Sequence, residues 1–181
     1  MPPSRFLQKG YKARKYKENE VFKGMIKILF VCHGNICRSP MAEFLFKDYV
    51  TKKGAADSFF IASAATSTEE IGNPVHHGTR EKLAPLGISV KGKTAVQMTK
   101  ADYQKYDYLI GMDSWNIRNM LRIVGNDSQH KIYSYLDFTE HPHDIADPWY
   151  TGNFDETYED ICEGMEGFYA HLRSINPKLP K

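Results

Sequence analysis

One short stretch near the start of the chain limits the fold more than any other. Residues 25–31 are a run of apolar and β-branched residues that stops at Gly34 and Asn35, as a buried strand does. Ser39 and Pro40 follow, and they are typical of a helix start, because serine caps the first turn and proline is favoured at its first position. The stretch predicts a strand, a short loop and a helix in succession, the opening unit of a parallel α/β fold.

The rest of the chain repeats this alternation. Strands are predicted over 58–62, 106–112 and 131–135, and helices over 39–54, 75–86, 114–122 (begun by a serine cap at Ser114) and 154–172. The last helix is the clearest, because its apolar residues are spaced alternately four and three positions apart. Strands that alternate with helices form βαβ units with right-handed crossovers. We expect a three-layer α/β domain in which a four-stranded parallel sheet carries helices on both faces.

Charge is distributed unevenly along the 181 residues, although the net charge is only +2. Residues 1–24 carry seven basic and two acidic side chains without apolar periodicity, whereas 17 basic and 20 acidic residues give 25–181 a net charge of −3. Residues 1–24 would suit a basic arm for nucleic acid or anionic lipid. We favour a disordered basic extension, left by cloning or an early start codon, ahead of one domain over residues 25–181.

Composition places the chain among ordinary globular proteins. A hydrophobic fraction of 41% and a charged fraction of 25% exclude wholesale disorder. The longest apolar stretch, residues 25–32, is too short to span a bilayer, and no secretory signal is evident. Three cysteines are a low, odd number that favours a reducing compartment. We expect a cytoplasmic protein, a monomer or weak dimer, with no nucleic-acid or membrane partner.

The loop after the first predicted strand has the composition of an anion-binding site. Ligands of parallel sheets bind at the carboxyl ends of strands, where Cys32 and a five-residue loop precede Arg38. Gly34 and Asn35 tolerate the left-handed angles of a tightly curled loop, so that the amides of residues 33–38 can point inward. Arg38 offers a planar fork for two oxygens of a tetrahedral oxyanion. The same donors would keep Cys32 a thiolate, so the sequence predicts a phosphate-binding loop beside a nucleophile.

Two separated motifs resemble those of one known family. Residues 31–43, Val-Cys-His-Gly-Asn-Ile-Cys-Arg-Ser-Pro-Met-Ala-Glu, closely resemble the signature loop of the low-molecular-weight protein tyrosine phosphatases. Residues 147–150, Asp-Pro-Trp-Tyr, resemble the Asp-Pro-aromatic loop of the same family. The resemblance extends over residues 25–181. It implies the family's fold and a phosphotyrosine-containing protein or peptide as substrate, with no metal and no organic cofactor.

The resemblance also implies a mechanism with a covalent intermediate. Cys32 is expected to attack the phosphorus of an aryl phosphate monoester, while Arg38 and the loop amides bind the equatorial oxygens. Asp147 is expected to protonate the leaving oxygen and then to deprotonate the hydrolytic water. Ser39 would donate a hydrogen bond to the sulfur, and Asp113 would help to fix the loops. The expected phosphate-binding residues are His33, Gly34, Asn35, Ile36, Cys37 and Arg38.

Several of these residues also have simpler interpretations. In the family, a cysteine placed like Cys37 can form a reversible disulfide with the nucleophile, which implies a redox switch. Cys32 and Cys37 could instead be half of a zinc site, but no Cys-x2-Cys pair or helical histidine pair completes one. Asp147 could simply begin a turn, and Asp113 could simply be a carboxylate at a helix start.

The sequence departs from the family pattern at the entrance to the substrate slot. The family usually has an aromatic residue where Glu69, followed by Glu70, stands here. One wall of the slot is then expected to be acidic and the opposite wall, formed by Trp149 and Tyr150, aromatic. We therefore expect weaker binding of simple aryl phosphates and a preference for basic residues near the phosphotyrosine. A family histidine expected near residues 91–93 is also missing.

Other functions share parts of this pattern. Arsenate reductases relay oxidation through extra cysteines on a later segment, but Cys162, in the last predicted helix, is the only later cysteine here. Bacterial protein-arginine phosphatases tend to have a threonine where Ile36 stands, and the bulkier Ile36 favours a phenolic ring over a guanidinium. A non-catalytic phosphate-binding module would need neither Cys32 nor Asp147. We expect a protein-tyrosine phosphatase, with a protein-arginine phosphatase as the alternative and arsenate reductase as the less favoured one.

Overall fold

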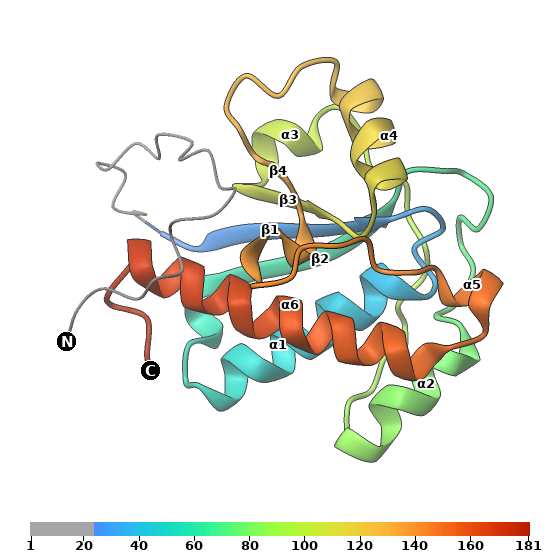
Figure 1. The fold of residues 1–181 in the computed structure, drawn as a ribbon, viewed down its shortest axis with the longest axis horizontal. Helices are drawn as coiled ribbons and strands as arrows, with labels where there is room; N and C mark the ends of the chain where they lie inside the picture. Colours follow the sequence, from blue (N-terminus) through green and yellow to red (C-terminus); the bar gives the residue numbers. More distant parts are fainter. Residues whose placement is uncertain (1–23) are drawn as a thin grey trace.

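A four-stranded parallel sheet organises the protein (Figure 1). The structure, a computed structural model, describes residues 24–181, so the extension predicted over 1–24 lies, but for its last residue, outside the described residues. Every neighbouring pair of strands is parallel, and their order is β2-β1-β3-β4. The strands are β1 (Ile26–Cys32), β2 (Phe59–Ala65), β3 (Tyr108–Gly111) and β4 (Ile132–Ser134). The predicted α/β class is confirmed.

Helices cover both faces of this sheet. In Figure 1, α1 and α6 lie on one side and α3 and α4 on the other, which gives the three predicted layers. Three short 3-10 helices are η2 (Ala56–Ser58), η3 (Ala84–Leu86) and η4 (Tyr135–Phe138). The α-helices are α1 (Arg38–Lys52), α2 (His77–Leu83), α3 (Asp102–Lys105), α4 (Ser114–Val124), α5 (Pro148–Thr151) and α6 (Phe154–Ile175). None of the helices within residues 24–181 has the length and apolar character needed to cross a bilayer.

Strand β1 is buried on both faces at every position except Lys27, as its largely apolar run predicts. Ile28 and Phe30 point into the core that contains residues of α1 and α6, whereas Leu29 and Val31 point into the core that contains residues of α4. Consecutive side chains of a strand alternate between its faces, so only a strand between two helical layers needs apolar residues at every position. This burial fixes where β1 ends and therefore where Cys32 lies.

The structure corrects two predicted caps. Helix α1 begins at Arg38 rather than at Ser39, and its cap residue Cys37 makes no side-chain hydrogen bond to the helix. Ser39 does not act as the cap because it lies inside the first turn, where its hydroxyl contacts the sulfur of Cys32. Helix α4 is capped by Asp113, not Ser114. An aspartate one position earlier reaches the free amide of the first turn better than the predicted serine does.

Other element boundaries also shift. Strand β2 runs to Ala65, three residues beyond the predicted end, because it pairs with β1 along the whole length of that strand. The predicted helix over 75–86 divides into α2 and the 3-10 turn η3, which contains Pro85 and ends at Gly87 with a left-handed φ of 73°. Helices α3 and α5 were not predicted; each is four residues long, too short for helical periodicity to show in the sequence.

The strand order brings the candidate site together. Strand β1 lies between β2 and β3, so the chain turns to one side of β1 for β2 and crosses to the other for β3. In open α/β sheets, ligands bind at the carboxyl edge where the strand order reverses in this way. The loop over residues 33–37 lies at that point, beside the residues that follow β3.

Candidate active site

The loop after β1 curls around the sulfur of Cys32. The amide of Asn35 donates to Sγ at 3.3 Å, and the hydroxyl oxygen of Ser39 lies 3.0 Å from the same atom. Asn35 has the predicted left-handed conformation, with a φ of 57°. Gly34 does not have a positive φ; a Cβ there would lie 3.3 Å from Cγ of Glu70, a tight contact that a small shift of the Glu70 side chain would relieve. Of the predicted loop amides, that of Asn35 therefore reaches the sulfur of Cys32.

The side chain of Arg38 is buried and held from two sides. It is 2% exposed, and Nη1 donates to Oδ2 of Asp113 at 2.6 Å and to the carbonyl of Ile145 at 2.8 Å. Nη2 donates to Oδ2 of Asp147 at 3.1 Å. Burial alone would lower the pKa of this guanidinium, but Cys32 and the two carboxylates outweigh burial and raise its pKa. Arg38 therefore stays cationic in a fixed orientation.

Asp113 and Asp147 each serve a helix and Arg38 at once. Oδ1 of Asp113 accepts from the amide of Asn116 at 2.7 Å, which caps α4, while its other oxygen contacts Arg38. Oδ1 of Asp147 accepts from the amide of Trp149 at 3.1 Å, which caps α5, while its other oxygen contacts Arg38. The simpler interpretations of both residues are thus correct without excluding a position at the site.

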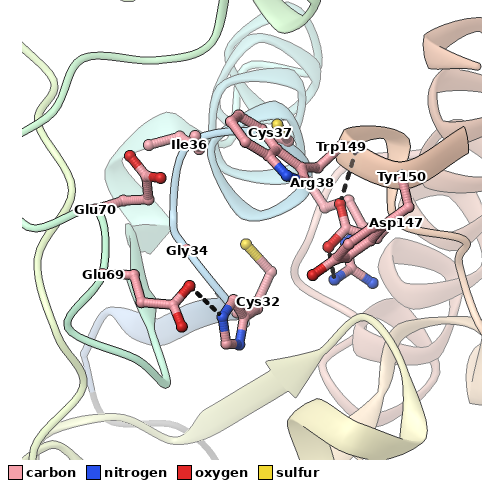
Figure 2. Close-up of a pocket in the computed structure, with 11 residues that line it drawn as sticks. Cys32, Gly34, Ile36, Cys37, Arg38, Glu69, Glu70, Asp147, Trp149 and Tyr150 are labelled. Atoms are coloured by element: carbon pink, nitrogen blue, oxygen red, sulfur yellow. Dashed lines mark hydrogen bonds and ion pairs between the residues drawn. The ribbon is translucent and has the colours of Figure 1, made fainter. Parts of the chain in front are cut away.

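The pocket has one acidic and one aromatic wall (Figure 2). The sulfur of Cys32 lies between Glu69 and Glu70 on one side and Trp149 and Tyr150 on the other. The carboxylate of Glu69 lies 2.9 Å from Nε2 of His33, so the predicted acidic wall is joined to the loop itself. The side chains of Trp149 and Tyr150 are exposed, which leaves their rings free to contact a substrate.

Cys37 lies in the same pocket but differs from Cys32 in chemistry. It is buried and packs with Ile36 and Ala95. Burial, reinforced by Cys32, raises the pKa of the Cys37 thiol to about 12, so that it is a neutral thiol at physiological pH. A neutral thiol is a poor nucleophile, so Cys37 is unsuited to the role expected of Cys32. Both cysteines are free thiols in this structure, and the predicted disulfide stays a prediction.

Two contributors to the site were not predicted. The carbonyl of Ile145 accepts from Arg38, and no sequence signal marks a backbone atom for such a role. Ser63 accepts a hydrogen bond from the side chain of Asn35 at 2.9 Å; it lies in a segment that matches the family, but its residue type alone assigns it no role. Within residues 24–181, no three His, Cys, Asp or Glu side chains converge closely enough to hold a metal ion.

Comparison with known proteins decides the family. A sequence model of the family described as low molecular weight phosphotyrosine protein phosphatase matches residues 27–178. The chain belongs to this family. It is 42% identical over 151 residues to the low molecular weight protein-tyrosine-phosphatase YfkJ of Bacillus subtilis, a match that covers 82% of this chain and 97% of YfkJ.

Solved structures agree with this family assignment. The crystal structure of YfkJ from Bacillus subtilis superposes with a TM-score of 0.79, covering 83% of this chain and 96% of that one. A Drosophila arginine phosphatase superposes with a TM-score of 0.75 at 26% identity, covering 82% of this chain and 98% of that one. As a low molecular weight phosphatase, the protein is a cysteine-dependent phosphoric monoester hydrolase with the predicted fold.

Proposed function

We propose that the protein hydrolyses phosphotyrosine in proteins or peptides through a phosphocysteine intermediate on Cys32. One observation carries this proposal: Cys32 Sγ, the buried guanidinium of Arg38 and the carboxylate of Asp147 line one pocket. A nucleophile, a fixed cation for phosphate oxygens and a proton donor are the three groups that such a reaction needs. Residues 25–181 form the phosphatase domain.

In the first step, the thiolate of Cys32 attacks phosphorus and the bond from phosphorus to the phenolic oxygen breaks. Arg38 and the amides of residues 33–38 stabilise the negative charge on the three equatorial oxygens, which is usually the largest catalytic contribution. The proton of Asp147 passes to the leaving phenolic oxygen. Because Asp147 must carry this proton when the substrate binds, we expect activity to fall above mildly acidic pH.

In the second step, water attacks the phosphorus of the phosphocysteine. Asp147, now ionised, takes a proton from this water, and the bond from phosphorus to sulfur breaks to restore the thiolate of Cys32. Ser39 lies 3.0 Å from that sulfur and can donate to it once it is negative. All of these groups belong to the chain, so the proposed reaction uses no cofactor and no metal.

The two walls of the pocket support an aryl substrate with a basic flank. Trp149 and Tyr150 offer aromatic surface for the phenolic ring. Glu69 and Glu70 line the opposite side, where a lysine or arginine next to the phosphotyrosine would find carboxylates. We expect lower KM values for phosphopeptides with such a residue than for small aryl phosphates.

A second candidate substrate is phosphoarginine in proteins. The acidic wall at Glu69 and Glu70 favours it, since two carboxylates would attract a guanidinium-derived group. Ile36, which lines the pocket, favours the flat ring of phosphotyrosine instead. Arsenate reduction is the less favoured alternative, because Cys162 lies on α6 and does not line the pocket.

Where the protein works and how it assembles stay predictions. The cysteines of residues 24–181 are free, which suits a reducing compartment, and we expect the enzyme in the cytoplasm. We expect a monomer or weak dimer whose macromolecular partners are its phosphoprotein substrates, without nucleic acid or membrane.

A kinetic panel tests the proposed function. Matched peptides that contain phosphotyrosine, phosphoarginine or phosphoserine are compared by kcat/KM, with arsenate reduction measured as a control. We expect phosphotyrosine to be preferred and turnover to disappear in Cys32→Ser. A preference for phosphoarginine would establish the second candidate, and turnover that survives in Cys32→Ser would refute the role of Cys32.

A further inference from the structure

A buried carboxylate lies behind the phosphate-binding loop, outside the pocket. Glu43 of α1 is 4% exposed, and its Oε1 accepts from Nζ of Lys47 at 2.6 Å. Its Oε2 lies 3.2 Å from Nζ of Lys93 and also accepts a hydrogen bond from the hydroxyl of Ser63. A buried carboxylate is stable as an anion only when cations and donors surround it in this way.

Lys93 differs from Lys47 in what else it holds. The side chain of Lys47 is 43% exposed and follows Glu43 by one turn of the same helix, an arrangement common on helix surfaces. The side chain of Lys93 is 14% exposed, comes from a separate segment, and also donates to the carbonyl of Ser63 at 3.0 Å. Lys93 therefore ties the carboxylate of α1 to strand β2.

The contacts beyond Glu43 lead to Asn35 in a fixed order of donors and acceptors. An ionised carboxylate can only accept, so the hydroxyl hydrogen of Ser63 points at Glu43. Oγ of Ser63 then accepts from Nδ2 of Asn35 at 2.9 Å. The other amide hydrogen of Asn35 goes to Oγ of Ser39 at 2.8 Å, and its Oδ1 accepts from the amide of Val96 at 3.1 Å. Every polar atom of the Asn35 side chain is thereby engaged.

The order continues to the sulfur of Cys32. Oγ of Ser39 accepts from Asn35 and lies 3.0 Å from Sγ. Its hydrogen reaches the carbonyl of Ala64 at a longer 3.4 Å, and it can turn to the nearer sulfur once that sulfur is a thiolate. Asn35 also presents its backbone amide to Sγ from a left-handed conformation, which is uncommon for a residue other than glycine and needs support from its surroundings. If Glu43 were protonated, it could donate to Ser63 instead, and the one-way order of donors would be lost.

We propose that Lys93 is a positioning residue for Cys32: by pairing with the carboxylate of Glu43, it orients Ser63, Asn35 and Ser39 around the nucleophile. The inference rests on the proposed function only in taking Cys32 as the nucleophile. Lys93 touches no reacting atom; it lies within residues 91–93, where the resemblance leads one to expect a histidine and the chain has none. Its effect is transmitted through buried hydrogen bonds. When every donor and acceptor of such a network has a partner, the side chains are held in one conformation.

The test measures the reactivity of Cys32 directly. In the full chain, the rate of alkylation of Cys32 by iodoacetamide is followed against pH, with peptide mapping to separate Cys32 from Cys37 and Cys162. We expect Lys93→Met to move the midpoint of this profile up by about one pH unit, since a lost donor network destabilises the thiolate. Lys93→Arg, which keeps the charge, should restore the wild-type midpoint.

Matched controls separate this role from a merely structural one. Lys91→Met makes the same substitution at an exposed neighbouring lysine and should leave the midpoint unchanged. Glu43→Gln removes the negative partner of the same ion pair and should shift the midpoint in the same direction as Lys93→Met. If one of the two variants folds poorly, the other still tests the inference. An unchanged midpoint in folded Lys93→Met or Glu43→Gln protein would overturn the inference.

The same measurements distinguish a failure of this inference from a failure of the proposed function. A wild-type midpoint near the value of free cysteine, about 8.5, would contradict the thiolate mechanism itself. A low wild-type midpoint that Lys93→Met does not change would contradict only the role of Lys93. A low midpoint that rises in Lys93→Met and returns in Lys93→Arg supports both.

Discussion

The two carboxylate oxygens of Asp113 make different contacts, one with helix α4 and one with Arg38, and substitutions can separate the effects of these contacts. Oδ1 caps α4 at 2.7 Å from the amide of Asn116, and Oδ2 accepts from Arg38 at 2.6 Å. Serine also caps helices, but its single short hydroxyl would not reach Arg38 as well. Asp113→Ser therefore removes the contact with Arg38 and keeps the cap, whereas Asp113→Ala removes both.

The expected magnitudes follow from these two contacts. Losing a helix cap costs about 1 kcal/mol, which for a protein of this size lowers Tm by roughly 2–4 °C. A hydrogen bond to a charged group contributes about 1.5–3 kcal/mol, equivalent to a factor of roughly ten to a hundred. Arg38 keeps its contacts with Ile145 and Asp147, so it should be displaced rather than released.

Thermal melts and steady-state kinetics of the two variants check this reasoning. Both variants should lose about ten- to a hundredfold in kcat/KM, because a displaced Arg38 binds the transition state poorly. Both variants should lower Tm, because both remove a contact of the buried Arg38, and Asp113→Ala should lower it by roughly 2–4 °C more than Asp113→Ser because it also loses the cap. If Asp113→Ser retained full kcat/KM in a folded protein, Asp113 would not orient Arg38 and the reasoning would be refuted.

Four further predictions concern other residues of the site and the core. Asp147→Ala should lower kcat by about 10²–10⁴ and remove the fall in activity above mildly acidic pH; a pH–rate profile that keeps this fall would identify another acid. Cys37→Ser should lose activity to peroxide less reversibly than wild type, as measured by recovery after thiol treatment, and equal recovery would exclude the protective disulfide. Glu69→Tyr should lower KM for aryl phosphates by adding a stacking surface, and an unchanged KM would show that the acidic wall does not limit binding. Burial lowers the pKa of His171 to about 4, so stability should fall as pH drops from about 6.5 towards 4, where the unfolded chain binds the proton first; His171→Gln should flatten this part of the curve in urea titrations.

Much of the fold follows from the sequence because one strand is apolar at every position but Lys27. The run over residues 25–31 predicts a strand between two helical layers, and this places Cys32 at the edge where ligands bind. The helix caps are less predictable. Ser39 is a good cap by type, yet its hydroxyl contacts the sulfur of Cys32 instead, so a local preference gives way to a tertiary contact.

Apart from the missing family histidine near residues 91–93, nothing in the sequence indicated the residues behind the loop, because their partners are distant in sequence. Glu43, Ser63 and Lys93 come from α1, β2 and a segment without regular structure, and only the folded chain brings them together. Nothing in their spacing indicates a shared function, since neither helical nor strand periodicity relates positions so far apart. In the structure, the burial of Glu43 draws attention to this group of residues, because a glutamate is rarely buried unless cations pair with it.

The central claim is that Cys32 carries the phosphoryl group between the two steps. Rapid acid quenching of Asp147→Ala during turnover of p-nitrophenyl phosphate, followed by mass spectrometry of its peptides, tests this claim directly. This leaving group departs without a proton from Asp147, whereas the second step is slow without its base. The mechanism predicts one added phosphoryl group on the peptide that contains Cys32, and none in Asp147→Ala that also carries Cys32→Ser. A phosphoryl group found on another residue, or turnover with no labelled peptide at any quench time, would contradict it.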